Sequence, residues 1–274
     1  MEVDLKEAVN AVSDVVQNRP RPLREFDQIH MKTGDMVMQS ELVADWADGR
    51  RLAFIGDGDA ISVCVAYLRA REVLDFGPSK ITVFDFDERN VEAVKRFADH
   101  ERLDQLDAEL YNCLDPFPQP GRFDCFYTNP PWGASNEGAS VNLFVQRGFE
   151  AVGYSGDGLV VIADDDELPW TKTVLGHVQS FAAERSFYVS RMQRRLHQYH
   201  LDDDPDLRSC NLFLGALPGA EDKNWAAEAF EHNDPRLKHF YGKNQPPRVR
   251  YVHEKKKPDY GRAPDEEYWI ETYK

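Results

Sequence analysis

The chain has 274 residues, of which 42% are apolar and 12% aromatic, and its formal net charge at pH 7 is −15. This length and composition predict a folded globular protein, and no apolar run approaches the roughly 18 residues that a membrane span needs. The acidic start is unlike a secretory signal, and the four dispersed cysteines show no metal-type spacing, so we expect a reduced, cytoplasmic protein. The negative net charge disfavours binding to nucleic acid, although a local basic patch could still bind it. The same charge either attracts a cationic substrate or serves solubility alone.

The N-terminal part of the chain shows apolar residues at helical spacing. This spacing predicts one helix over residues 3–18 and a second over residues 36–47, and the proline-rich stretch between them is typical of an irregular connector. We divide the chain into an N-terminal helix and connector over residues 1–35, a catalytic domain over 36–220 and a C-terminal extension over 221–274.

From residue 50 onward, short apolar strands alternate with helices. We expect strands within residues 50–59, 79–88, 107–118, 122–132 and 158–167, and helices within 60–74, 89–103 and 140–152. Strands that alternate with helices of this length predict an α/β fold with a doubly wound, mostly parallel sheet and helices on both faces. In such sheets ligands bind beyond the carboxyl ends of the strands, and each expected strand ends in polar or unusual residues.

The last third of the chain has a weaker pattern. Residues 180–200 mix helix and strand signals, and residues 210–217 predict a late strand. The tail could complete the sheet, cover the cleft or form a homodimer contact, and its basic, aromatic stretch 248–257 favours a solvated tail. The eight histidines show no convincing ligand spacing, so we expect no metal and assign His197 and His200 to a surface pair.

Polar residues after the first three strands indicate a nucleotide site. Asp85 is placed to accept hydrogen bonds from ribose hydroxyls, with Phe86 beside it, and Asn112 could pair with an adenine edge. For Asp87 and Asp115 we expect caps of the following helix or turn. The turn after the first strand lacks the third glycine of a dinucleotide loop, and its acids suit a ligand with an amino or sulfonium cation. That turn consists of Gly56, Asp57, Gly58 and Asp59.

The fourth strand runs into the sequence TNPPWG, residues 128–133. Proline offers no N–H group to a sheet, so the chain leaves the strand there through a rigid turn. The side-chain oxygen of Asn129 and the carbonyl oxygen of Pro130 can accept hydrogen bonds from an amino group. Trp132 can stack on a base or make a cation–π contact with an ammonium group. We interpret these residues, with Asp59, as the catalytic group.

Several segments together resemble the branched-chain polyamine synthase family, the bis(aminopropyl)spermidine synthases. They span roughly residues 20–153 and read PRPLREFDQIHMKTGDMV, LAFIGDGDAISV, VFDFDERNVEAV, YNCLDPFP and RFDCFYTNPPWGASNEGASVNLFVQRGFEAV. The resemblance implies a fold like that of class I methyltransferases. It also implies transfer of an aminopropyl group from decarboxylated S-adenosylmethionine to a secondary amine of spermidine.

The resemblance also suggests roles for individual residues. Asp57, Gly58 and Asp59 fall on the family's acidic Gly/Asp motif, and Asp85 falls on its ribose-binding acid. The segment Glu25, Phe26, Asp27 and Gln28 falls on the family's E-Y-D-Q stretch, which would close over the site, with Gln28 at the cofactor and Asp27 at the substrate. The alternative for this segment is an ordered connector that packs on the sheet.

Three features depart from the family pattern. The reactive turn of the family is D-P-P-Y, whereas this chain has Asn129 and Trp132, and an asparagine can neither accept a proton nor balance an ammonium ion. Asn112 replaces a usual aspartate. We expect no N-terminal winged-helix-like domain, because about 20 residues precede the first matching segment. The sequence Asn-Pro-Pro-aromatic is instead typical of amino-methyltransferases that act on adenine, cytosine or glutamine nitrogens.

Three functions therefore remain open from the sequence. The first is aminopropyl transfer to a small cationic amine, with the acids after the fifth strand holding a polyamine or simply starting a solvated helix. The second is N-methyl transfer from S-adenosylmethionine to a nucleobase, amide or small amine. The third is a non-catalytic relative of the fold. The acids after the fifth strand are Asp164, Asp165, Asp166 and Glu167.

Overall fold

The structure of the chain is a computed structural model. It describes residues 4–202, 206–223, 225, 230–231, 233–241, 248–255 and 268–273. No helix in these described ranges is both long enough and apolar enough to cross a bilayer.

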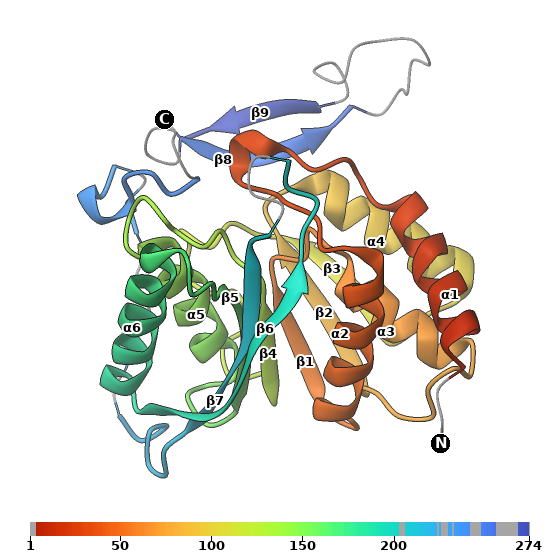
Figure 1. Cartoon of the computed structure of the whole chain (residues 1–274), viewed down its shortest axis with the longest axis horizontal. Coiled ribbons are helices and arrows are strands. Elements are labelled where there is room, and N and C mark those ends of the chain that lie inside the picture. The colour runs from red at the N-terminus through yellow and green to blue at the C-terminus, as the bar shows by residue number, and fades with distance from the viewer. Residues whose placement is uncertain are drawn as a thin grey trace.

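A seven-stranded sheet with the order β3-β2-β1-β4-β5-β7-β6 forms the centre of the protein (Figure 1). The strands from β1 to β5 pair in parallel, and β7 runs antiparallel to both β5 and β6. The predicted doubly wound, mostly parallel sheet is thus confirmed. The strand bounds are β1 Arg51–Ile55, β2 Lys80–Asp85, β3 Leu106–Leu110, β4 Cys125–Thr128, β5 Asp157–Ala163, β6 Phe187–Gln198 and β7 Arg208–Ala216.

Helices cover both faces of the sheet. Alternate residues of a strand point to opposite faces, so Leu52 and Phe54 of β1 pack with the first four helices, whereas Ala53 and Ile55 pack with the last two. Apolar side chains on both faces explain why the central strands read as continuous apolar runs. The helices are α1 Leu5–Asn18, α2 Thr33–Trp46, α3 Ile61–Ala70, α4 Glu88–Glu101, α5 Ala139–Ala151 and α6 Pro169–Glu184, with 3-10 turns η1 Arg24–Phe26 and η2 Pro235–Leu237.

In the last third, the mixed pattern of residues 180–200 is explained and the surface position of His197 is corrected. Residues 180–200 divide into the end of α6 and the strand β6, whose mixed pattern arises because it is an edge strand with many exposed residues. His197 is 2% exposed and bonds Ser209 and Gln39, so it belongs to a buried polar network and not to a surface pair.

The described part of the basic tail is also ordered. It forms a strand, β8 Val249–Glu254, which pairs with β9 Tyr268–Thr272 in a hairpin above the sheet (Figure 1). The Val252 N–H donates to the Phe86 carbonyl at 3.1 Å, which fastens this hairpin to the carboxyl end of β2. Lys256 and Lys257, the end of the predicted patch, lie outside the described residues.

Candidate functional site

The carboxyl ends of β1, β2, β3 and β4 surround a cleft with about 860 Å³ of empty volume. Most residues that the sequence predicts for the site line this cleft. They are Asp27, Gln28, Gly56, Asp57, Gly58, Asp59, Asp85, Phe86, Asn112, Asn129, Pro130 and Trp132. Segments from the connector to the fourth strand therefore meet in one place.

The turn after β1 is shaped by Gly56 and Asp57. Gly56 has a φ of +74°, and a Cβ atom there would lie 3.2 Å from the Phe144 ring, so a larger residue would be strained. The carboxylate of Asp57 accepts hydrogen bonds from the N–H groups of Ile61 and Ser62, both at 3.0 Å. Burial raises the pKa of Asp57 to about 8. Its carboxyl group thus satisfies the first N–H groups of α3, and Asp57 also lines the cleft.

Asp85 lies at the end of β2 and is 4% exposed. Its carboxylate accepts the N–H groups of Asp57 at 3.1 Å and Asp87 at 2.8 Å. Burial, with the nearby charge of Asp87, raises the pKa of Asp85 to about 6. Gln28 of the connector donates to the Asp87 carboxylate at 3.1 Å. The acid predicted for the ribose is thus buried at the cleft wall, and the connector is tied next to it.

Asp59 and the turn after β4 are directly bonded. Nδ2 of Asn129 donates to Oδ2 of Asp59 at 2.8 Å, and the Met31 N–H donates to Oδ1 of Asp59 at 2.7 Å. The indole Nε1 of Trp132 donates to Oδ1 of Asn129 at 3.3 Å. These bonds fix the Asn129 carboxamide with its nitrogen toward the acid. Burial raises the pKa of Asp59 above that of an ordinary carboxyl group.

Tyr199 completes this part of the cleft, and sequence reasoning missed it. Its ring lies edge-on to Trp132 with a centroid distance of 4.9 Å, and its hydroxyl bonds the Ser209 hydroxyl at 2.8 Å. Tyr199 follows β6, which runs parallel to β5 because both strands are antiparallel to β7. A strand assignment for residues 187–198 would have placed Tyr199 at the same sheet edge as the other site residues.

Asn112 is held differently from the adenine contact that the sequence suggests. Its Nδ2 donates to the backbone carbonyls of Val249 at 3.3 Å and Arg250 at 2.7 Å, and its Oδ1 accepts the Leu114 N–H at 2.9 Å. The carboxamide therefore fastens β8 to the cleft. A carboxylate could not make the two donations, which gives a physical reason for asparagine at this position.

Aromatic rings from three distant segments meet beside Asp85. Tyr241 stacks on Phe86 at a centroid distance of 5.7 Å, and Phe26 lies edge-on to both rings, at 5.5 Å from Phe86 and 5.3 Å from Tyr241. Sequence reasoning missed Tyr241, which follows the short turn η2 in a part of the chain without periodic pattern. Together these rings form an apolar wall of the cleft.

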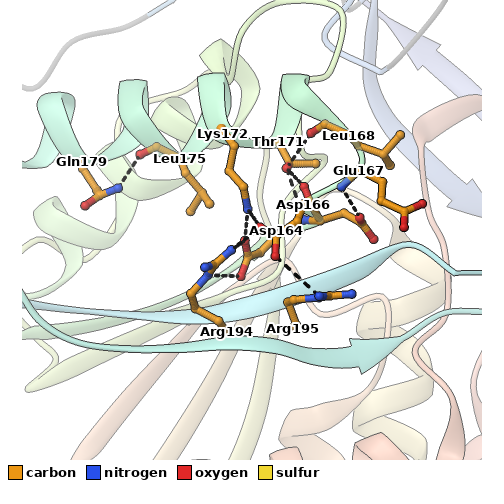
Figure 2. Close-up of polar contacts among 11 residues, drawn as sticks. Asp164, Asp166, Glu167, Leu168, Thr171, Lys172, Leu175, Gln179, Arg194 and Arg195 are labelled. Carbon is orange, nitrogen blue, oxygen red and sulfur yellow. Dashed lines mark hydrogen bonds and ion pairs between the residues drawn. The ribbon is translucent and has the colours of Figure 1, made fainter.

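The acids after β5 do not line the cleft. Figure 2 shows the carboxylate of Asp164 between Lys172 and Arg194, at 2.5 Å and 3.0 Å, while Asp166 also bonds both cations. Asp165 accepts the Glu167 N–H at 2.9 Å. This geometry does not support the predicted contact of these acids with a polyamine, because their charges are already paired.

Among the described residues, no group of three or more His, Cys, Asp or Glu side chains is arranged to hold a metal ion. A sulfonium nucleoside fits the residues present, because a buried carboxylate, an aromatic wall and a backbone turn line one cleft. Asp85, Phe86 and the turn Gly56–Asp59 are the residues that could hold it.

Comparison with known proteins agrees with this geometry. The curated N(4)-bis(aminopropyl)spermidine synthase of Thermococcus kodakarensis is 26% identical over 153 residues, which cover 54% of this chain and 40% of the relative. The enzyme of the same name from Methanocaldococcus jannaschii is also 26% identical, over 51% of this chain and 38% of the relative. The matched region thus spans less than half of these relatives' length.

Solved structures show the same fold. The branched-chain polyamine synthase of Thermus thermophilus, solved with N4-aminopropylspermidine and 5′-methylthioadenosine, superposes with a TM-score of 0.67 at 20% identity, covering 82% of this chain and 67% of that one. A proposed RNA methyltransferase of Pyrococcus horikoshii superposes with a TM-score of 0.57 at 14% identity, covering 78% of this chain and 100% of that one. The fold is therefore methyltransferase-like. The sequence profile of the branched-chain polyamine synthase A C-terminal domain matches residues 7–268, and the chain belongs to this family.

Proposed function

We propose that the chain transfers an aminopropyl group from decarboxylated S-adenosylmethionine to a secondary nitrogen of a spermidine-type polyamine. The observation that carries the proposal is the bonded group of Asp59, Asn129 and Trp132 at the cleft, next to the buried Asp85. Family membership supports the same reaction, and the formal net charge of −15 favours the approach of a cationic amine.

Different residues of the cleft would bind different parts of the ligand. Asp85 would accept hydrogen bonds from ribose hydroxyls, and Phe86 with Tyr241 would contact the base. Decarboxylated S-adenosylmethionine supplies a carbon made electrophilic by the sulfonium. The carboxyl groups of Asp57 and Asp59 favour a cationic ligand and disfavour one that carries its own carboxylate.

The acceptor amine must lose a proton before it attacks, because a free alkylamine has a pKa of roughly 10. Asp59 is the base that the geometry offers, since Asn129 cannot accept a proton. Oδ1 of Asn129 and the Pro130 carbonyl would orient the nitrogen. One proton passes from the ammonium to Asp59, the nitrogen forms the new bond to carbon, and the carbon–sulfur bond breaks to leave a neutral thioether.

A second function, N-methyl transfer, is favoured by the turn Asn129–Trp132. An asparagine and a proline carbonyl suit an amino group that needs no prior loss of a proton, such as a planar nucleobase or amide nitrogen. Asn129→Asp separates the two functions. Under aminopropyl transfer, the new carboxyl group adds a second proton acceptor beside Asp59 and raises the rate, whereas under methyl transfer it abolishes turnover.

The experiment is incubation of the purified chain with spermidine and either decarboxylated or intact S-adenosylmethionine, followed by mass spectrometry of the amine. An aminopropyl gain from the decarboxylated cofactor supports the first function, and a methyl gain from the intact cofactor supports the second. Absence of both, with no binding of 5′-methylthioadenosine by calorimetry, would favour a non-catalytic relative.

A further inference from the structure

Arg19 lies directly behind the proposed base. It is the residue that follows α1, and its side chain is 6% exposed. Nη1 donates to the Asp59 carbonyl at 3.0 Å and lies 3.9 Å from Oδ1 of Asp59. Arg19 does not line the cleft and instead borders a smaller hollow with Asp57 and Gly58. Any effect on the reaction must therefore be indirect, and Asp59 is the cleft residue that Arg19 contacts.

The environment of Arg19 is unusual for a cation. A buried guanidinium is costly unless a carboxylate compensates it. Burial lowers the pKa of Arg19, and the charge of Asp59 opposes this shift. Nη1 of Arg19 also donates to the Met36 sulfur at 3.3 Å, which is a weak acceptor. The carboxyl group of Asp59 is thus the main group that stabilises the buried charge of Arg19.

Several titratable or charged groups face Asp59 from the elements around it. They are Arg19 after α1, Asp57 in the same turn, Cys64 of α3, Tyr127 of β4, and Tyr199 and His200 after β6. Asp57 opposes ionisation of Asp59, and the tyrosines carry no charge at neutral pH. Arg19 is a permanent cation, because a guanidinium does not deprotonate in proteins.

We propose that Arg19 is a positioning residue for the transfer reaction: it keeps the Asp59 carboxylate ionised and thereby holds Asn129 with its carboxamide oxygen available to the amine. This inference rests on the function proposed above. An ionised Asp59 can only accept hydrogen bonds, so the Asn129 nitrogen must face it. A protonated Asp59 could donate instead, which would permit the carboxamide to turn over and would remove the base.

The test is the pH dependence of kcat/KM for Arg19→Met, Arg19→Gln and Arg19→Lys. Loss of a neighbouring positive charge raises the pKa of a carboxyl group by about 1 unit or more. We therefore expect the acidic limb of the kcat/KM–pH profile to move to higher pH by that amount in the Met and Gln variants. In the Lys variant, which keeps the positive charge, the limb should stay near its wild-type position. Arg21→Met, at an exposed arginine of the same connector, is the matched control and should not shift the limb.

A purely structural role for Arg19 predicts a different result, namely a lower rate at every pH with the limb unmoved, and that result would overturn the inference. A second readout does not need activity. In protein labelled with 13C at the aspartate carboxyl carbon, the Asp59 signal is assigned by its loss in Asp59→Asn. Its titration should move to higher pH in Arg19→Gln, and an unchanged titration would contradict the inference even where the wild-type chain transfers no group. Thermal unfolding identifies any variant that does not fold, and the other two then carry the test.

Discussion

Two acidic strand ends of this protein look alike in sequence and differ in structure. The carboxyl ends of β1 and β5 each carry aspartates at the same edge of the sheet. Asp59, after β1, bonds Asn129 and faces the cleft, with a buried arginine 3.9 Å away. Asp164, after β5, is paired with Lys172 and Arg194 and lies outside the cleft lining. The position at a strand end locates a carboxylate, but its place relative to the cleft decides whether it can serve a ligand.

The two ends also differ in their protonation. Burial raises the pKa of Asp57 to about 8 and that of Asp85 to about 6. At the other end, hydrogen bonds from Lys172 and Arg194 lower the pKa of Asp166 to about 2. Raised values near neutral pH are typical of sites that handle protons, whereas lowered values are typical of ion pairs. The raised pKa values at the cleft end are in line with the proton transfer proposed there.

The largest expected effect is that of Asp59→Asn, which removes the proposed base with almost no change in shape. General-base catalysis contributes roughly 10²- to 10⁴-fold, so kcat for aminopropyl transfer should fall by that range. Calorimetry with 5′-methylthioadenosine serves as the control and should show unchanged affinity. A kcat close to wild type would assign the proton transfer to another group.

The next effect is that of Asp85→Asn on nucleoside binding. Hydrogen bonds to a charged group contribute about 1.5–3 kcal/mol, so Kd for 5′-methylthioadenosine should rise roughly 10- to 100-fold. Asp164→Asn, at the other acidic end, is the matched control and should bind as the wild type does. Equal affinities for wild type and Asp85→Asn would show that the ribose site lies elsewhere.

The ion-paired end should matter little for the reaction. Asp164→Asn combined with Asp166→Asn leaves the cleft intact, so KM for the polyamine should change by no more than about twofold. Exposed ion pairs contribute about 0–1 kcal/mol each, so the loss of the half-exposed Asp166 carboxylate should cost little stability. The Asp164 carboxylate is buried between Lys172 and Arg194, so its loss should cost more. A large rise in KM would restore the role in polyamine binding that the sequence suggested for these acids.

The last prediction concerns how pH alters stability, not the reaction. Asp57 has a raised pKa in the folded state, so its favourable contribution is present at low pH and is lost as pH rises toward about 8. Asp166 has a lowered pKa, so its contribution is present above the ordinary carboxyl range and is lost as pH falls toward about 2. In urea unfolding of the unliganded chain, the free energy of unfolding of Asp57→Asn should therefore rise relative to that of the wild type between pH 5 and 8. Asp166→Asn should be less stable than wild type at pH 5, and this difference in the free energy of unfolding should disappear as pH falls to 3. Profiles of stability against pH that run parallel in the variants and the wild type would contradict these assignments.

The sequence predicted the parts of this site that depend on local pattern. The apolar strands and their polar ends placed Asp59, Asp85 and Asn129 at one edge, because parallel strands align their carboxyl ends. It failed where the partner lies far along the chain. Asp164 is bonded to Lys172 of α6, which lies 8 residues later in the chain, and to Arg194 of β6, which lies 30 residues later. No local pattern signals such a pairing.

Two other failures have the same physical origin. Tyr199 was missed because β6 is an edge strand whose exposed residues break the apolar run that marks a strand. The contact of the Asn112 carboxamide with β8 was also missed, because Val249 lies 137 residues further along the chain, and the adenine contact of Asn112 stays a prediction. Residues that act through tertiary contacts need the structure to be recognised.

The most direct test of the proposed function is the reaction itself in the wild-type chain. With decarboxylated S-adenosylmethionine and spermidine, the account predicts that N4-aminopropylspermidine and 5′-methylthioadenosine form in equal amounts, and that Asp59→Asn forms neither at a comparable rate. Methylated amine from intact S-adenosylmethionine, with no aminopropyl product from the decarboxylated cofactor, would contradict it.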